Sequence, residues 1–173
     1  MKQPPVTHGE SSIAEQIARA ARREGPGFDP TVLGITLSLL RASAELERAH
    51  VAELSPYRLT TSQFNVLTVL DRADEPLTMG RLGQAISVLP ANLTSVVDAL
   101  ARREYVERLA NERDRRSSLV RITESGRAFL RDFLPGHWAH LQRLMSDLRP
   151  EERTQLHSLL ERFVESLRLS RSG

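Results

Sequence analysis

Cysteine is absent from this chain of 173 residues. Without a thiol the protein has no disulfide, no thiolate metal site and no cysteine-based redox sensor. Long apolar runs are missing as well, because no segment approaches the ~20 residues that a membrane-spanning helix needs. The first residues hold no apolar stretch typical of a secretion signal. We therefore expect a cytoplasmic protein without membrane contact.

Aromatic residues and lysine are also scarce. Aromatics make up 5% of the chain, and Lys2 is the one lysine among 24 basic residues. The apolar 40% is therefore mainly Leu, Val, Ile and Ala, which favours a helical core. Arginine binds phosphates and base edges through its planar fork, so the composition is compatible with DNA binding. A coding bias toward arginine explains it equally well, and composition alone decides nothing.

The N-terminal third predicts two helices. Residues 1–27 form an arm with a short amphipathic helix at 12–24. Asp29-Pro30 has the residues of a helix start, and residues 31–53 carry an apolar surface broad enough to be covered on two sides. Ser55-Pro56 ends this second helix.

The middle of the chain predicts the order helix, short helix, helix, strand, polar loop, strand. A capping box at Thr60–Gln63 starts the first of these helices, and Thr78 caps the short one after a strand begun by Leu77. Two helices joined by a tight turn and followed by a hairpin form a winged helix-turn-helix. The expected bounds are Pro90–Arg103 for the second helix of the motif, 105–109 and 119–122 for the strands, and 110–117 for the loop.

Two more helices follow the hairpin. Thr123 caps the first, at about 124–147, and Pro135-Gly136 inside it is expected to kink or split it. The second starts at Arg149-Pro150 and carries one apolar stripe at helical spacing, Leu156, Leu159, Leu160, Phe163, Val164 and Leu167. The fold class is therefore mainly α with a small β-hairpin wing.

The second helix of the motif is the candidate reader of the major groove. Leu93, Val96, Val97 and Leu100 are expected to face inward, which leaves short polar side chains outward in the first two turns. Such side chains reach base edges, and free N–H groups at a helix start meet phosphate. The alternative is an ordinary solvated helix face. The candidate DNA-binding residues here are Pro90, Asn92, Thr94 and Ser95.

The hairpin tip holds the second candidate group, Arg113, Asp114, Arg115 and Arg116. Arginine on an exposed tip suits the narrow minor groove, where negative potential is strong. Asp114 opposes phosphate binding, and a physical reason for it is to hold a neighbouring arginine by a bidentate pair. A solvated charged turn is the alternative, but a basic wing directly after a helix-turn-helix favours DNA.

These stretches resemble the MarR family of transcriptional regulators, over about residues 28–169. The stretches that carry the resemblance are Leu77–Leu82, Val96–Leu100, Asp114-Arg115-Arg116, Leu119, Ile122-Thr123 and Gly126-Arg127. The resemblance implies a homodimer, with residues 28–55 and 124–169 forming the dimerization helices and 56–123 the DNA-binding domain. It implies that Arg116 enters the minor groove and that Asp114 orients it or a nearby arginine. Leu89 and Ser95 depart from the family, which usually has a Ser or Thr cap and often an Arg at these positions.

The resemblance also implies a small effector, often a phenolic or other aromatic acid. Candidate lining residues are Leu40, Arg41, Phe64 and Trp138, with Arg41 as the partner of a carboxylate; core packing or a surface ion pair is the alternative for each. His137 and His140 are spaced for a metal with help from His50 or a glutamate, but packing or solvation accounts for them better, and no metal or other cofactor is expected.

Two other classes of function fit the sequence less well. An enzyme is disfavoured, because the sequence has no phosphate-binding glycine loop, nucleophile elbow or metalloprotease helix. A protein-interaction module that uses the winged-helix scaffold without sequence-specific DNA binding has no need of the wing arginines. The expected function is a ligand-responsive repressor that binds a palindromic operator on double-stranded DNA as a homodimer.

Overall fold

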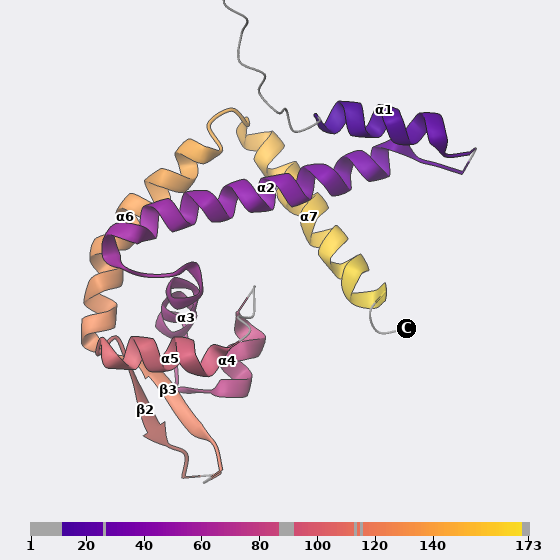
Figure 1. Cartoon of the computed structure of the whole chain (residues 1–173). Coiled ribbons are helices and arrows are strands. Elements are labelled where there is room, and N and C mark those ends of the chain that lie inside the picture. The colour runs from indigo at the N-terminus through magenta and orange to yellow at the C-terminus, as the bar shows by residue number, and fades with distance from the viewer. Residues whose placement is uncertain (1–11, 26, 87–91, 113, 115, 171–173) are drawn as a thin grey trace, which may run out of the picture. The chain divides into compact units, whose positions relative to one another are not determined.

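The computed structural model describes residues 12–25, 27–86, 92–112, 114 and 116–170. The described chain is mainly helical with one small sheet (Figure 1). It divides after Phe64 into two compact units, and each is described by itself. The helices of the described residues include none long and apolar enough to cross a membrane.

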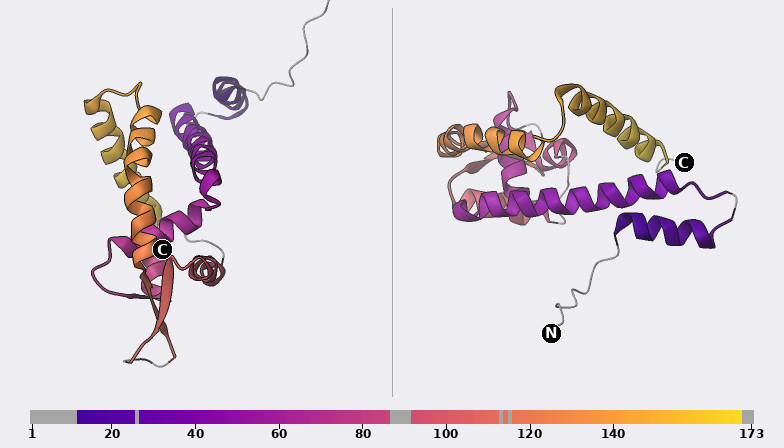
Figure 2. Two further views of the ribbon diagram at one scale, coloured as in Figure 1. Left: turned by 90° about the vertical axis from the view of Figure 1, so that its left-hand side faces the viewer. Right: turned by 90° about the horizontal axis from the view of Figure 1, so that it is seen from above.

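The first unit begins with helix α1 (Ile13–Arg23), which packs on α2 (Pro30–Leu54). Ser12 and Glu15 form a capping box at the start of α1, which confirms the short helix predicted here. Figures 1 and 2 show α1 lying alongside the first part of α2. Gly34 permits the close approach, because a Cβ there would lie 3.1 Å from Ile17 Cδ1.

The predicted ends of α2 are also confirmed. Asp29 Oδ1 accepts a hydrogen bond from the backbone N–H of Thr31 at 2.8 Å, and Pro30 occupies the first turn. The 3₁₀ turn η1 (Ser55–Tyr57) follows. Helix α3 (Thr61–Asp71) then begins at the predicted capping box of Thr60 and Gln63, whose two hydrogen bonds measure 3.0 and 3.2 Å.

The sheet in the second unit has three antiparallel strands, β1 (Leu77–Thr78), β2 (Val106–Ala110) and β3 (Ser118–Ile122), in the order β1-β3-β2. Leu119 lies opposite Thr78 on one side and Leu109 on the other. The predicted hairpin is confirmed to within one residue. Its partner β1 was predicted as a strand, but the pairing was not. Pairing of Leu77 with Val120 and of Thr78 with Leu119 ties β3 to the segment before the helix-turn-helix.

The helix-turn-helix is formed by α4 (Met79–Ala85) and α5 (Leu93–Arg102), and α5 packs on α4 and β2. Leu82, Val97, Leu100 and Val120 have no exposed surface. Full burial of each such side chain is worth about 1.5–3 kcal/mol. This small core fixes the distance between α5 and the sheet.

Helix α6 (Glu124–Leu144) is joined closely to the end of the sheet. The Thr123 hydroxyl accepts a hydrogen bond from the backbone N–H of Gly126 at 3.1 Å and donates one to the carbonyl of Glu104 at 2.6 Å. The backbone N–H of Thr123 donates to the carbonyl of Tyr105 at 3.0 Å. A Cβ at Gly126 would lie 2.3 Å from that same carbonyl oxygen, so this position requires glycine.

Pro135 does not split α6, which runs unbroken from Glu124 to Leu144. Of the two outcomes predicted for Pro135, the split is therefore excluded, and Figure 1 shows the axis of the helix changing direction along its length, as a kink requires. A row of stacked rings extends from Tyr105 along the helix through Phe129, Phe133 and His137, with centroid distances of 5.4–5.6 Å. These contacts support the segment that carries the proline.

The last helix, α7 (Pro150–Ser170), has no buried residue. Glu152 caps it by accepting hydrogen bonds from the backbone and guanidinium of Arg149, and these bonds lower the pKa of Glu152. The predicted apolar stripe lies open in the single chain, where Leu159 is 50% and Leu167 48% exposed. Large apolar side chains of α2, among them Val32, Leu40 and Val51, are also exposed.

Candidate nucleic-acid interface

The recognition helix α5 begins later than predicted. Its N-cap is Asn92, whose side-chain oxygen accepts a hydrogen bond from the backbone N–H of Ser95 at 3.1 Å. The prediction of a cap at Leu89 and a helix start at Pro90 was wrong for this helix, which starts at Leu93. Leu89 and Pro90 themselves lie outside the described residues. Asn92, predicted to reach bases, thus also has a structural task.

The predicted faces of α5 are confirmed. Val97 and Leu100 are fully buried, while Thr94 and Ser95 are exposed beside the exposed cap residue Asn92. Short polar side chains therefore surround the helix start, where the unpaired backbone N–H groups favour an anion. This end of the helix has the chemistry that a base edge or a phosphate requires.

The wing consists of β2, β3 and the loop between them, and Figure 2 shows it projecting from the rest of its unit. Two backbone hydrogen bonds form its tip, from Asp114 N–H to the carbonyl of Asn111 at 3.2 Å and from Ser117 N–H to that of Asp114 at 3.0 Å. The Asn111 amide donates to the Ser117 hydroxyl at 2.8 Å. These bonds connect the described residues of the loop, and among these Asp114 and Arg116 are exposed.

Asp114 acts on the backbone of the tip. Its Oδ1 accepts a hydrogen bond from the backbone N–H of Arg116 at 3.0 Å, so the carboxylate shapes the turn that carries Arg116. The expected bidentate pair with the guanidinium of Arg113 or Arg115 concerns residues outside the described part of the chain. The side chain of Arg116 is exposed, and Arg113 and Arg115 lie outside the described residues.

An ion pair between helix and wing was missed in the sequence. Arg108 of β2 donates to Asp98 Oδ1 of α5 through Nη2 at 2.7 Å and Nε at 3.2 Å. Its Nη1 donates to the hydroxyl of Ser118 on β3 at 3.1 Å. Strand alternation was the available signal, because it places Arg108 on the same face as the buried Val106.

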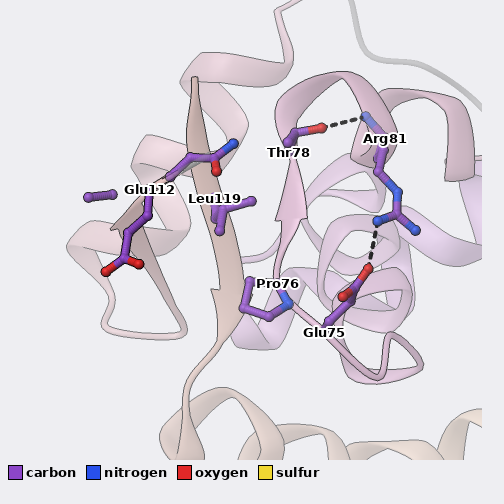
Figure 3. Close-up of a pocket in the computed structure, with 8 residues that line it drawn as sticks. Glu75, Pro76, Thr78, Arg81, Glu112 and Leu119 are labelled. Atoms are coloured by element: carbon purple, nitrogen blue, oxygen red, sulfur yellow. Dashed lines mark hydrogen bonds and ion pairs between the residues drawn. The ribbon is translucent and has the colours of Figure 1, made fainter. Parts of the chain in front are cut away.

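A cavity of about 460 Å³ lies between the segment from Glu75 to Arg81 and the part of the wing where β2 passes into its loop. In Figure 3 the guanidinium of Arg81 turns toward Glu75, at 2.7 Å, while Thr78 caps the start of α4. Glu112 adds a second carboxylate to the lining. An aromatic acid would meet one paired arginine and two carboxylates here, so this cavity does not suit the expected effector.

The predicted effector residues fall in both units of the chain. Phe64 is buried, whereas Leu40 is 65% and Trp138 44% exposed. Leu40, Arg41 and Phe64 belong to the first unit, and Trp138 to the second, where its ring contacts that of His137 at 5.2 Å. A shared pocket for these four side chains remains a prediction.

The histidines in the described part of the chain form no metal site. His137 is buried within the ring stack of α6. Across the described residues, no group of three or more His, Asp or Glu side chains is placed to hold a metal ion.

Comparison with known proteins agrees with this geometry. The model of the MarR family matches residues 59–118. The multiple antibiotic resistance protein MarR of Salmonella typhimurium is 34% identical over 113 residues, which cover 64% of this chain and 77% of the relative.

Two solved structures connect the fold to DNA and to a ligand. A mutant of Escherichia coli MarR, complexed with operator DNA, superposes with a TM-score of 0.70 at 28% identity, and the match covers 77% of this chain and 95% of that one. Bordetella bronchiseptica BpsR, whose DNA binding is regulated by 6-hydroxynicotinic acid, has a TM-score of 0.69 at 25% identity. The match covers 75% of this chain and 92% of BpsR.

Proposed function

The chain belongs to the MarR family of transcriptional regulators, and we propose that it binds a palindromic operator through the start of α5 and the tip of the wing. The observation that carries the proposal is the pairing of two surfaces in one unit. Exposed Thr94 and Ser95 surround the N-terminus of a helix, and exposed Arg116 lies on the hairpin that packs against that helix. A major-groove reader and a minor-groove arginine need this arrangement.

The two contacts have different tasks. Asn92, Thr94 and Ser95 contact base edges or phosphates at the start of α5, together with the backbone near Pro90. Arg116 enters the minor groove, with Arg113 and Arg115 beside it in sequence, and Asp114 orients Arg116 through the backbone of the tip. Sequence preference therefore arises mainly from α5, and the wing contributes affinity.

The protein acts as a homodimer, as members of this family do. The exposed apolar side chains of α2 and α7 supply the surface, because a soluble monomer rarely leaves such a stripe open. We propose residues 28–55 and 124–169 as the dimerization region, 56–123 as the DNA-binding domain and 1–27 as an N-terminal arm. Two recognition helices then meet half-sites about one turn (~10 bp) apart.

A small aromatic or phenolic acid is the proposed effector, with Leu40, Arg41, Phe64 and Trp138 as its contacts. Support comes from BpsR, whose regulator 6-hydroxynicotinic acid is an aromatic acid. A ligand that favours another spacing of the two recognition helices lowers DNA affinity by its differential affinity for the two forms. In this proposal the protein is a cytoplasmic repressor without enzymatic activity.

Selection from a random duplex library, followed by fluorescence anisotropy, tests the function. We expect the protein to enrich a palindrome and to bind it far more tightly than scrambled DNA, with an affinity that falls steeply as salt rises. The same assay then screens aromatic acids for release of the DNA. Enrichment of no sequence, also after ligand is removed by unfolding and refolding, would replace this function with that of a protein-interaction module.

A further inference from the structure

The ion pair between Arg108 and Asp98 joins the two elements that meet DNA. Arg108 donates three hydrogen bonds, two to Asp98 on α5 and one to Ser118 on β3. Asp98 follows Thr94 by one helical turn, so the bridge lies directly behind the exposed start of the helix. One guanidinium thus connects the recognition helix with both strands of the wing.

The bridge has the geometry of a fixed contact. The side chains of Arg108 and Asp98 are 31% and 45% exposed, so solvent screens their attraction and the pair adds little to folding stability. The planar fork of arginine nevertheless sets direction, since three donors in one plane meet partners on two elements. The ion pair therefore serves mainly to orient the wing relative to α5.

A carboxylate on a DNA-binding helix needs an explanation. Asp98 lies on α5 with Thr94 and Ser95, where a negative charge repels the DNA backbone. A helix under selection for affinity alone would have a neutral residue there. A second task of the carboxylate would explain why Asp98 is present despite this repulsion, and its contact with Arg108 supplies such a task.

We propose that Arg108 is a positioning residue for DNA binding. Its hydrogen bonds to Asp98 and Ser118 hold the wing at a fixed angle to α5. The inference rests on the proposed function and deepens it. With the bridge in place, the start of α5 and the wing tip reach major and minor groove together. Without it, the wing can still bind DNA, but no longer in register with the helix.

Asp98→Ala gives the sharpest test, because it removes both the charge and the oxygen that accepts from Arg108, and two explanations then predict opposite signs. If Asp98 acts only by its charge, its removal tightens binding to every duplex. If it anchors Arg108, the selected palindrome loses about tenfold in affinity, the size of one lost contact. Binding to scrambled DNA then stays level or becomes tighter, so the specificity ratio falls.

Arg108→Lys separates positioning from a phosphate contact. Lysine keeps the positive charge, but it is a point charge without the fork that reaches Asp98 and Ser118 together. We expect the same tenfold loss as for Asp98→Ala, and the double variant should lose no more than either single one. Arg121→Lys is the matched control, since Arg121 pairs with Glu107 on the opposite face of the same strands, and it should bind like wild type.

The measurements are anisotropy titrations of full-length protein with the selected palindrome and with scrambled DNA, with thermal unfolding by circular dichroism as a check of folding. Tighter palindrome binding by Asp98→Ala, or wild-type binding by Arg108→Lys, overturns the positioning role alone. A wild-type protein that selects no sequence overturns the proposed function and this inference with it.

Discussion

The side chain of Asn92 accepts a hydrogen bond from the backbone N–H of Ser95, so two predicted DNA-binding residues are also the cap of their helix. An alanine at position 92 therefore removes two properties at once. The helix loses about 1 kcal/mol of stability, and the operator loses an amide contact worth about 1–3 kcal/mol at particular base pairs.

Asn92→Ser separates these effects, because serine caps a helix nearly as well but lacks the amide. We expect Asn92→Ser to unfold at the wild-type temperature and yet to lose discrimination at one or two base pairs. Anisotropy against a set of singly substituted operators measures this. An unchanged base preference in both variants would remove Asn92 from the list of base readers.

Arg116→Ala should weaken binding to all duplexes and reduce the slope of log affinity against log salt by about one, because one positive charge near the DNA phosphates is lost.

Asp114→Asn keeps the oxygen that accepts from Arg116 N–H and removes a negative charge, so the DNA affinity of this variant should equal or exceed that of wild type. Asp114→Ala removes the acceptor and should weaken binding although it removes the same charge. If the alanine and asparagine variants bind alike, the turn has no part in placing Arg116.

Gly126→Ala should destabilise the protein by about 3 kcal/mol, because the added Cβ would lie 2.3 Å from the Tyr105 carbonyl and 2.7 Å from Ile122 Cγ1. Gly80→Ala is the control within α4, where a Cβ meets nothing within 4 Å and the better helix former should stabilise by about 0.5–1 kcal/mol. Denaturant unfolding of the two variants gives both values. Equal stabilities would show that the chain relaxes at Gly126.

Leu159→Glu should convert the dimer to monomer, since it introduces a charge into the apolar stripe of α7. Ser158→Glu adds the same charge at the adjacent exposed position outside the stripe and should leave the dimer intact. Sedimentation velocity at micromolar concentration distinguishes the two states. A dimeric Leu159→Glu variant would exclude this face of α7 from the interface.

Local signals predicted most of the fold. The caps at Thr60, Thr78 and Thr123 depend on neighbouring residues within three positions, and all three are present in the structure. The strands of the wing follow from alternation and a polar loop between them. Each of these features is decided by hydrogen bonds or burial within one short segment.

The start of α5 was predicted less well, because proline is a good first helical residue and drew the boundary to Pro90. Asn92 is a stronger cap than any residue just before that proline, and the helix begins after it. The preference for Asn as a helix cap thus sets the start of α5, and the proline does not. A search for Asn or Asp as the cap near the predicted helix start would have identified Asn92.

Local signals in the sequence did not identify the long-range partners. The pairing of β1 with β3 and the contact of Arg108 with Asp98 join residues that local periodicity treats separately. Pro135 shows a related effect, since the stack of Phe129, Phe133 and His137 keeps α6 continuous across a residue that breaks isolated helices. Such outcomes depend on which segments meet in space.

The junction of β3 and α6 works as a rigid mechanical coupling. Thr123 is bonded to Glu104 and Tyr105, Gly126 lies against the Tyr105 carbonyl, and Arg127 binds Asp71 of α3 at 2.8 Å. We therefore expect a rotation of the first turn of α6 to turn the sheet with it and to displace the tip of the wing.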